Sequence, residues 1–583
     1  MTNSKKRTIG LLVEDIFSDY TKEIIRSVHE AIPDNGSARL LVLAGRYDDG
    51  TCADANLRAF NTVYNSIYHL GEACDVDGLI VALGSLRTLG EGAAESGLMR
   101  RLRGVPKVFI SADIPGCIQV RYDNESGIRE AVELLTNVYG FSRLCMLGGR
   151  EDNGDALERR DIFARCLCEK GLDFPPQAYV GTDMSENCKA EAARLLDANP
   201  DAQAVFCVND AAAKGLYEAM RERGLRPGRD LLVFGFDNTR MSGEMDPPLA
   251  SIGPTEQTIG AKAVQLLLAC LDGKETTGEI VPTHLFTRAS LSFNQFDFAP
   301  LTLQFMDDAG ICRMFDECFY RYRSELYSRD RVDLRRLFLE LAHRMQRAMS
   351  RRFMSHEEFK MVTKMIDIFV ANGAFEFTDT ERLMRGIDYV QTNINTVQRS
   401  AAANQAINRL FLHLKDCLIY AFAEQKAAEA RRMLREQESL QNYLITGTDC
   451  SLDGVDRLDW LAENIGMLGL ANAAFFLYDE PVTIGEDGNA SYPENIRLRC
   501  VLKDGEAHIP SADRQNGPVK TSFAREELPS RCRGYLVFPV FCGRRVYGYL
   551  ACAASGSVYD HGELVADQLG RVICLNEKNR KKH

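Results

Sequence analysis

The chain has 583 residues, of which 26% are charged and 45% hydrophobic, and these proportions are ordinary for a globular protein. A chain of this length exceeds what one hydrophobic core organises, so three or four domains are expected. The formal net charge of −12 argues against a general nucleic-acid-binding surface, although a local basic patch is compatible with it.

The cysteine pattern and the N-terminus both indicate a protein that stays inside the cell. The 18 cysteines are scattered without a C-x-x-C pair, and Cys166 and Cys168 point to different sides of a predicted helix. This pattern fits reduced thiols better than disulfides or zinc ligands. The sequence shows neither a secretory signal nor an apolar run approaching the roughly 20 residues that cross a bilayer. A cytoplasmic location without membrane attachment is therefore expected.

Strands and helices alternate through the first part of the chain. The runs TIGLLVED, RLLVLAG, DGLIVALGS and VPKVFISA are predicted strands, and helices are predicted at 21–32 and around 57–70. This alternation is the signature of a doubly wound α/β layer. The first strand ends at Asp15, and Phe17 follows where the chain enters the first helix.

A second set of α/β elements begins at VRYDNESGIREAVELL. Asp123 and Asn124 end a predicted strand there, and we expect them to cap the following helix. RLCMLGG is the next strand, and EDNGDALERRDIF begins a charged helix that contains Arg159.

Residues 204–238 form a predicted β–α–β unit. AVFCV and LLVFGF are buried strands, and Asn209 and Asp237 come directly after them. Because ligands bind at the carboxyl ends of parallel strands, both side chains are predicted to point into one cleft. The alternative is that Asn209 and Asp237 only cap turns.

Several motifs of this region, in order, resemble the sugar-binding sensor domain of LacI/GalR-type transcription regulators. They are VNDAAAKGL, DLLVFGFDN and PPLASIGPTEQTIGAKAVQLLL, together with the V-x-x-D-N-x-x-G pattern that begins at Val120. The resemblance covers residues 8–296 and implies the two-lobed fold of type I periplasmic binding proteins.

The resemblance also implies which residues contact a ligand. In the family, residues after the first strand line the sugar site, which here gives Asp15 and Phe17, with Tyr20 as a further candidate. An aromatic ring at this place can lie on the apolar face of a sugar. The family's ligand-binding arginine, counted back four residues from Phe163, falls on Arg159, whose guanidinium can grip two hydroxyls or a carboxylate. The alternatives are a core position for Phe17 and a surface position for Arg159.

Two features depart from the family. Ser251-Ile252-Gly253-Pro254 stands where the family commonly has Gln after T-V-R, which leaves the identity of the sugar open. Only MTNSKKR precedes the first strand, and this segment is too short for a helix-turn-helix, so none is expected there.

Residues 301–445 are predicted to be a helical spacer. RVDLRRLFLELAHRMQRAMSRRF has apolar residues at spacings of three and four, and Ser355 with Glu358 is a predicted capping box. The run 403–445 lacks Pro and Gly and predicts one long helix, either a two-stranded coiled coil or part of a bundle within one chain. His413 on this helix is expected at a helix–helix contact. The alternative, a phospho-accepting histidine, would require a nucleotide-binding domain that the sequence does not show.

Residues 446–583 are predicted to be a small α+β domain that resembles a GAF domain. A helix is predicted at 458–470, a hairpin around Gly543 and a closing helix at 560–575. The segment shows no GAF ligand motif, so a structural role is expected for it.

The fold class predicted from these segments is a multi-domain α/β protein with a two-lobed sensor, a helical spacer and a GAF-like domain. Arg159, Asn209 and Asp237 offer the mixed donors and acceptors that a hydroxyl-rich ligand requires. The sequence shows no catalytic pair and no metal-ligand cluster, so neither catalytic residues nor a cofactor nor a metal is expected.

The function predicted is that of a cytosolic bacterial signalling or transcription-regulatory protein. It would sense a sugar or related metabolite, form a homodimer and act on a downstream partner. Two alternatives remain open. One is a LacI-family regulator that acts at DNA through a partner or an unrecognised segment, and the other is a remnant of the input module of a diguanylate cyclase or histidine kinase.

Overall fold

The computed structural model describes most of the chain, and its contacts define two units. The described residues are 6–33, 36–46, 54–82, 104–111, 117–254, 258–291, 306–319, 322, 333–350, 355–378, 383–384, 386–388, 390–391, 401–448, 462–465, 470–486, 488–529, 532–554 and 556–580. The first unit is Met1–Leu291 with Glu436–His583, and the second is Ser292–Arg435.

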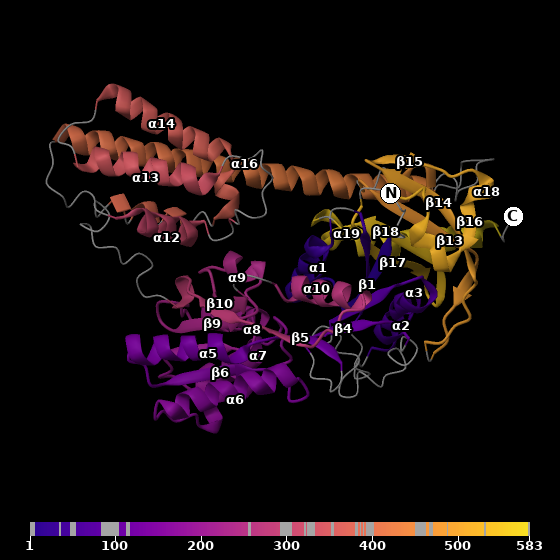
Figure 1. The fold of residues 1–583 in the computed structure, drawn as a ribbon, viewed down its shortest axis with the longest axis horizontal. Helices are drawn as coiled ribbons and strands as arrows, with labels where there is room; N and C mark the ends of the chain where they lie inside the picture. Colours follow the sequence, from indigo (N-terminus) through magenta and orange to yellow (C-terminus); the bar gives the residue numbers. More distant parts are fainter. Residues whose placement is uncertain are drawn as a thin grey trace. The chain divides into compact units, whose positions relative to one another are not determined.

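The N-terminal lobe of the first unit is built on a parallel sheet (Figure 1). Its strands, in spatial order, are β11 (Glu279–Val281), β5 (Ile118–Tyr122), β4 (Lys107–Ile110), β3 (Gly78–Ala82), β1 (Arg7–Glu14) and β2 (Ala38–Gly45). Its helices are α1 (Asp19–Ala31), α2 (Ala55–Tyr64), η1 (Asn65–His69), α3 (Leu70–Ala73) and α10 (Ile259–Leu271). Leu11 packs in the core beneath α1 and α10, whereas Leu12 packs in a second core with η1 on the opposite face. Successive side chains of β1 therefore point to opposite faces of the sheet.

The second lobe is built on another sheet of the same type. Its strands, in spatial order, are β12 (Thr283–Phe286), β10 (Ala250–Pro254), β9 (Leu232–Phe236), β8 (Ala204–Cys207), β6 (Leu144–Gly148) and β7 (Tyr179–Gly181). All pairs are parallel except β12 with β10. Its helices are α5 (Asn124–Glu133), η4 (Leu134–Val138), α6 (Gly154–Glu169), η5 (Pro176–Ala178), α7 (Lys189–Ala198), α8 (Asp210–Glu222), α9 (Arg240–Glu244) and η6 (Ala289–Leu291). The two-lobed α/β architecture predicted from the sequence is confirmed.

The chain crosses between the two lobes three times. It passes from β5 to α5, returns from β10 to α10, and passes again from β11 to β12. Crossings of this kind give the two lobes a shared set of connections about which they can rotate.

The C-terminal strands of the first unit continue the sheet of the N-terminal lobe. They are β13 (Ala473–Thr483), β14 (Asn495–Lys503), β15 (Glu506–His508), β16 (Asn516–Pro518), β17 (Gly534–Cys542) and β18 (Arg545–Ala553), accompanied by α18 (Ala512–Gln515), η10 (Val519–Ala524) and α19 (Gly556–Arg580). Within this set the pairs are antiparallel, and β17 and β18 form the predicted hairpin at Gly543.

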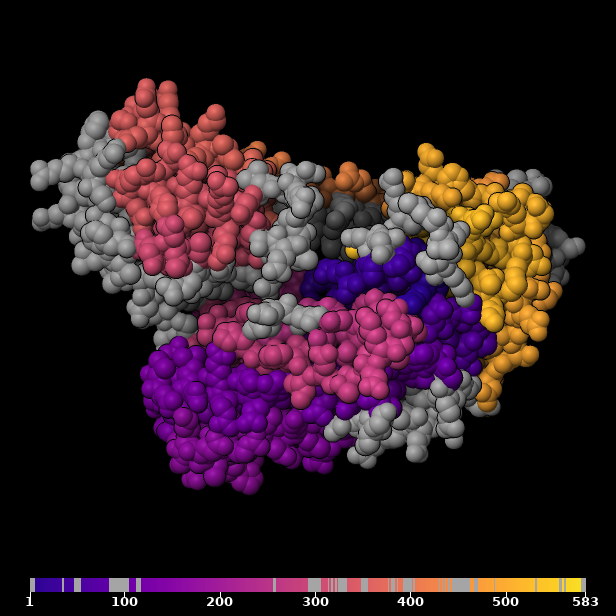
Figure 2. All heavy atoms as spheres, in the orientation of Figure 1, coloured from indigo at the N-terminus to yellow at the C-terminus, as the bar shows by residue number. Residues whose placement is uncertain are grey.

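β17 pairs in parallel with β2, from Gly534 opposite Leu40 to Val537 opposite Leu43, so one sheet of twelve strands results. The yellow C-terminal residues accordingly lie directly against the indigo and purple N-terminal ones (Figure 2). The sequence did not predict this continuity. The GAF-like character of residues 446–583 stays a prediction, and much of the helix predicted at 458–470 lies outside the described residues.

The second unit is helical. Its elements are α12 (Asp308–Cys318), α13 (Leu334–Ser350), α14 (His356–Ala371), η8 (Ala374–Phe377) and most of α16 (Ala401–Thr448). The capping box predicted at Ser355 and Glu358 is present at the start of α14. The long helix predicted over 403–445 is α16, and its buried residues Leu410 and Leu418 share a core with α14. A coiled coil with a second chain stays a prediction.

Within the part of the chain that the structure describes, no helix has the length and apolar character of a membrane span.

The close approach of α19 to β17 generates a stability prediction. A Cβ at Gly570 would lie 2.0 Å from the Phe541 carbonyl oxygen, a backbone atom that cannot rotate away. Gly570→Ala should therefore lower the thermal midpoint, because overpacking costs about 1–3 kcal/mol and exceeds the roughly 1 kcal/mol that alanine gains in a helix. Gly154→Ala, where nothing lies within 4 Å of the added atom, is the matched control and should leave the midpoint nearly unchanged. Equal midpoints for both variants and the parent in a thermal melt would contradict this packing.

Candidate functional site

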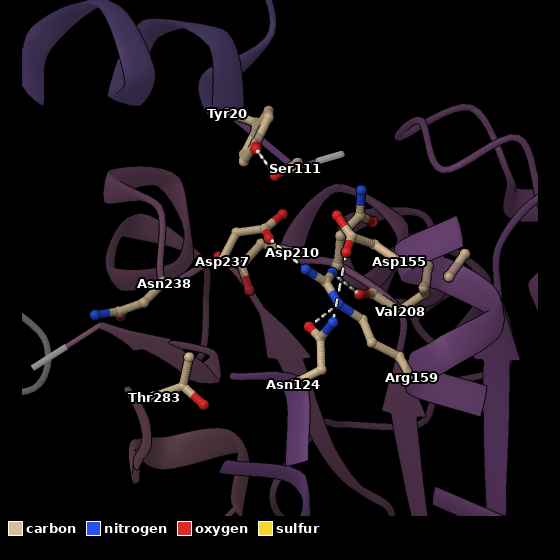
Figure 3. Close-up of polar contacts among 12 residues, drawn as sticks. Tyr20, Ser111, Asn124, Asp155, Arg159, Val208, Asp210, Asp237, Asn238 and Thr283 are labelled. Atoms are coloured by element: carbon tan, nitrogen blue, oxygen red, sulfur yellow. Dashed lines mark hydrogen bonds and ion pairs between the residues drawn. The ribbon is translucent and has the colours of Figure 1, made fainter. Parts of the chain in front are cut away.

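Arg159 lies at the centre of a polar cluster at the carboxyl edge of the second lobe's sheet (Figure 3). Its side chain is 4% exposed, and three of its nitrogens donate hydrogen bonds. Nε donates to Asn124 Oδ1 at 3.0 Å, Nη1 to the Val208 carbonyl at 2.8 Å and Nη2 to Asp237 Oδ1 at 3.4 Å. The guanidinium carbon lies 3.6 Å from the centroid of the Phe236 ring. The alternative of a surface position for Arg159 is therefore wrong.

Local sequence explains why these groups meet. Asn153 caps α6 by accepting from the Ala156 backbone N–H at 2.9 Å, which fixes the start of the helix that carries Arg159. Val208 and Asp237 directly follow β8 and β9, two neighbouring parallel strands. Since carboxyl ends of parallel strands share one edge of a sheet, the guanidinium reaches both.

Asp237 stands in a backbone conformation that is unusual for a residue with a side chain. Its φ is 97°, and Asp15 after β1 and Ser111 after β4 also have positive φ, at 57° and 55°. Residues held in such conformations cluster at functional sites. Burial raises the pKa of Asp237, while the charge and hydrogen bond of Arg159 act in the opposite direction.

Groups of the N-terminal lobe face this cluster (Figure 3). The Tyr20 hydroxyl lies 3.1 Å from Ser111 Oγ. Burial raises the pKa of Tyr20, and the nearby charge of Asp237 raises it further. The phenol thus stays neutral and serves as a hydrogen-bond donor or acceptor opposite the carboxylate and guanidinium of the second lobe.

The other two predicted residues of the N-terminal lobe are exposed. Asp15 accepts a hydrogen bond from the Phe17 backbone N–H at 3.3 Å, and both side chains reach solvent. The Phe17 ring is 46% exposed, so the alternative of a core position for Phe17 is not observed. The Arg46 guanidinium carbon lies 5.4 Å from the centroid of this ring.

Asn209 has its side chain engaged within the second lobe. Its Oδ1 accepts from the Ala212 backbone N–H at 2.9 Å, which caps α8, and its Nδ2 donates to the Met184 carbonyl at 2.9 Å. Capping, one of the two interpretations of this residue, is thus observed. A ligand contact of Asn209 stays a prediction.

Asn124 and Asp210 are buried polar residues of the cluster that the sequence did not assign to the site. Asp123 caps α5 by accepting from Glu125 and Ser126 backbone N–H groups, whereas Asn124 instead turns its oxygen to Arg159. Asp210, at the first turn of α8, is fully buried behind Asp237. The sequence signal for both residues was their position in a pair of adjacent polar residues, Asp123-Asn124 and Asn209-Asp210. Such a pair does not show which member caps the helix and which one faces the site.

Asp210 is held by donors from two segments. Ser251 Oγ donates to its Oδ1 at 2.5 Å, and the Thr239 backbone N–H and hydroxyl donate to its Oδ2 at 2.8 and 2.9 Å. Ser251 is the first residue of the Ser251-Ile252-Gly253-Pro254 segment, and it donates to the carboxyl behind the site. Burial raises the pKa of Asp210 to about 7, the charge of Asp237 acts in the same direction, and these hydrogen bonds oppose the shift.

Comparisons with known proteins agree with this architecture. Residues 138–291 match the family model described as a periplasmic binding protein-like domain. The HTH-type transcriptional regulator DegA of Bacillus subtilis (strain 168) is 28% identical over 304 residues, which are 50% of this chain and 83% of DegA. The HTH-type transcriptional repressor CytR of Escherichia coli (strain K12) is 26% identical over 275 residues, which are 46% of this chain and 74% of CytR.

Among solved structures, the transcriptional regulator CelR–cellobiose complex is 22% identical and aligns over 49% of this chain and 86% of its own, with a TM-score of 0.41. Residues 138–291 thus match a periplasmic binding protein-like domain, and about half of the chain is similar in sequence to HTH-type transcriptional regulators.

The buried carboxyl of Asp210 makes stability depend on pH. An unfolded aspartate has a pKa of about 3.9, so the folded state holds this proton more tightly than the unfolded chain does. The contribution of Asp210 is fully present below about pH 4 and is lost as the pH rises through about 7. Asp210→Asn keeps the shape and removes the titration, so urea unfolding between pH 5 and 8 should show a shallower decline in stability than in the parent protein. Parallel declines in both proteins would contradict the shift.

Proposed function

We propose that the two-lobed domain binds a polar small molecule, a sugar or related metabolite, between its lobes, and that binding regulates transcription or another cytosolic signalling output. One observation carries the proposal. Arg159 and Asp237 of the second lobe face the Tyr20–Ser111 pair of the N-terminal lobe, so donors and acceptors converge from both sides (Figure 3). A ligand with several hydroxyls satisfies such a mixed set, because each group it buries finds a partner.

The residues proposed to contact the ligand differ in how firmly their side chains are already held and in how exposed they are. Arg159 keeps two of its five N–H groups beyond the three bonds described above, and it is held rigidly by Asn124 and Val208. Asp15 and Phe17 are exposed and available to a ligand, the ring by stacking on an apolar sugar face. Asn209 would contact the ligand through the hydrogen-bonding positions of its amide that its bonds to Ala212 and Met184 do not use.

The similarity to HTH-type regulators supports a regulatory output rather than a metabolic one. We infer that the chain acts as a homodimer, with α16 in a coiled coil and the GAF-like segment in a structural role. The three crossings between the lobes make rotation on ligand binding the natural signal.

A physical route for this signal runs from the cleft side of the N-terminal lobe to α19. Arg46 follows β2, and its guanidinium lies 5.4 Å from the ring of Phe17, 5.7 Å from that of Phe60 and 5.4 Å from that of Tyr64. The same guanidinium forms an ion pair with Glu563 of α19, whose side chain is 9% exposed. A ligand that stacks on Phe17 would therefore displace or order a cation that α19 also binds.

Substitutions at the facing groups test the binding site. Asp237→Asn and Tyr20→Phe should each weaken binding by about 1–3 kcal/mol, because the first replaces a charged acceptor oxygen with an amide donor and the second removes a hydroxyl, both with little change of size. The measurement is calorimetry with a panel of monosaccharides, disaccharides and nucleosides, followed by titration of the compound that binds. Arg160→Ala, beside Arg159 on α6 but paired outward with Asp161, is the matched control and should bind normally. Unchanged affinity in both test variants would remove this site from the proposal.

A second experiment tests the route to α19. Glu563→Gln should leave ligand affinity within a few fold, while the ligand-induced change in amide hydrogen exchange of α19 is reduced or lost. Glu577→Gln, which removes the ion pair to Arg545 near the other end of α19, is the control and should retain the change. If α19 responds equally in both variants, the Arg46–Glu563 contact does not carry the signal.

A further inference from the structure

The second unit brings three metal-binding side chains together on two packed helices. His413 and Cys417 lie one turn apart on α16, so they share one face of that helix. Asp367 comes from α14 and meets them there. Among the described residues, they form the one group of histidine, cysteine and carboxylate side chains whose ligand atoms converge in this way.

The distances resemble those around a tetrahedral metal ion. His413 Nε2 lies 3.6 Å from Cys417 Sγ, and Cys417 Sγ lies 3.9 Å from Asp367 Oδ1. Zinc bonds of about 2.0 Å to nitrogen and oxygen and about 2.3 Å to sulfur place ligand atoms about 3.3–3.5 Å apart. The third distance, 2.7 Å from His413 Nε2 to Asp367 Oδ1, is a hydrogen bond that would open by roughly 0.6 Å to admit an ion.

The helices are fixed by packing, whereas the ligand side chains keep freedom to adjust. Ile366 and Phe369 flank Asp367 on α14, and Leu410 and Leu418 flank the other two on α16, all four buried in the core of the unit. The side chain of Asp367 is 53% exposed and that of His413 is 33% exposed, so a rotation of either accommodates the longer separation.

A second histidine–aspartate pair in the same unit supplies a comparison. His343 Nε2 lies 2.8 Å from Asp308 Oδ1, and the Asp308 side chain is 70% exposed, more than that of Asp367. Within the residues that the structure describes, no third metal-binding side chain joins that pair in a converging group. The addition of a half-buried thiol is therefore what distinguishes the cluster at His413.

We propose that Asp367, His413 and Cys417 bind a divalent transition-metal ion, best zinc, through one oxygen, one nitrogen and one sulfur. Imidazole and thiolate ligands select zinc over calcium or magnesium, and three protein ligands leave the fourth position to water. Binding releases the thiol proton and links α14 to α16. The ion would stabilise the first half of α16, where His413 and Cys417 lie, independently of any ligand in the two-lobed domain.

Cobalt substitution tests the site in the full chain. Titration of the reduced, chelator-treated protein with Co²⁺ should give a thiolate-to-cobalt charge-transfer band and the strong visible bands of tetrahedral coordination at one equivalent. Cys417→Ser should abolish the charge-transfer band, and His413→Gln should weaken binding at least tenfold. His343→Gln and Cys168→Ser are the controls and should keep the parent spectrum, since neither residue belongs to the cluster.

Hydrogen exchange supplies a readout that does not depend on colour. Addition of Zn²⁺ should slow exchange in the second half of α14 in the parent protein and in His343→Gln, but not in Cys417→Ser. A tetrahedral cobalt spectrum that survives in both Cys417→Ser and His413→Gln, or no binding in the parent protein, would overturn the assignment and leave the trio as a hydrogen-bonded helix contact.

Discussion

The buried guanidinium of Arg159 is the interaction on which the rest of the site depends. A charge taken out of water is costly unless its N–H groups find acceptors. Arg159 finds them in three separate segments: the first turn of α5, the residue after β8 and the residue after β9. Asp237, which accepts from this guanidinium, has a positive φ, and Asn124 turns its oxygen to the same group. One charged side chain therefore organises the edge that the proposed ligand would meet.

Asp210 lies behind this edge and connects the elements that form it. It accepts from Ser251 and Thr239, which join α8 to β10 and to the segment after β9. Its burial places a second carboxyl close to Asp237, and the repulsion between the two is one reason that the pKa of Asp210 is raised. The electrostatic balance of the edge thus includes a residue that the ligand would not touch.

Because β2 pairs in parallel with β17, the C-terminal strands belong to the same sheet as the N-terminal lobe. Backbone hydrogen bonds along a shared sheet edge join them to the N-terminal lobe, and α19 adds the Glu563 contact to Arg46. An edge strand is a place where added strands pair readily, because its N–H and C=O groups are unsatisfied. Any reorientation of the N-terminal lobe would carry these strands with it. The helical unit contains a separate cluster of Asp367, His413 and Cys417.

The sequence by itself determined the local elements of this protein. Hydrophobic periodicity, caps and turn residues are local properties, so the alternating strands, the capping box at Ser355 and the length of α16 could be predicted. The family resemblance, counted back from Phe163, pointed to Arg159 and the strand ends pointed to Asp237, and the structure places both residues in one polar cluster. Only the tertiary structure decided what depends on long-range contact. It showed which polar residue caps and which turns inward at Asp123–Asn124 and Asn209–Asp210, because two adjacent candidates are equivalent in sequence. It joined β17 to β2, and it brought Asp367 to His413 and Cys417, because helix packing and strand pairing are set by surfaces far apart along the chain.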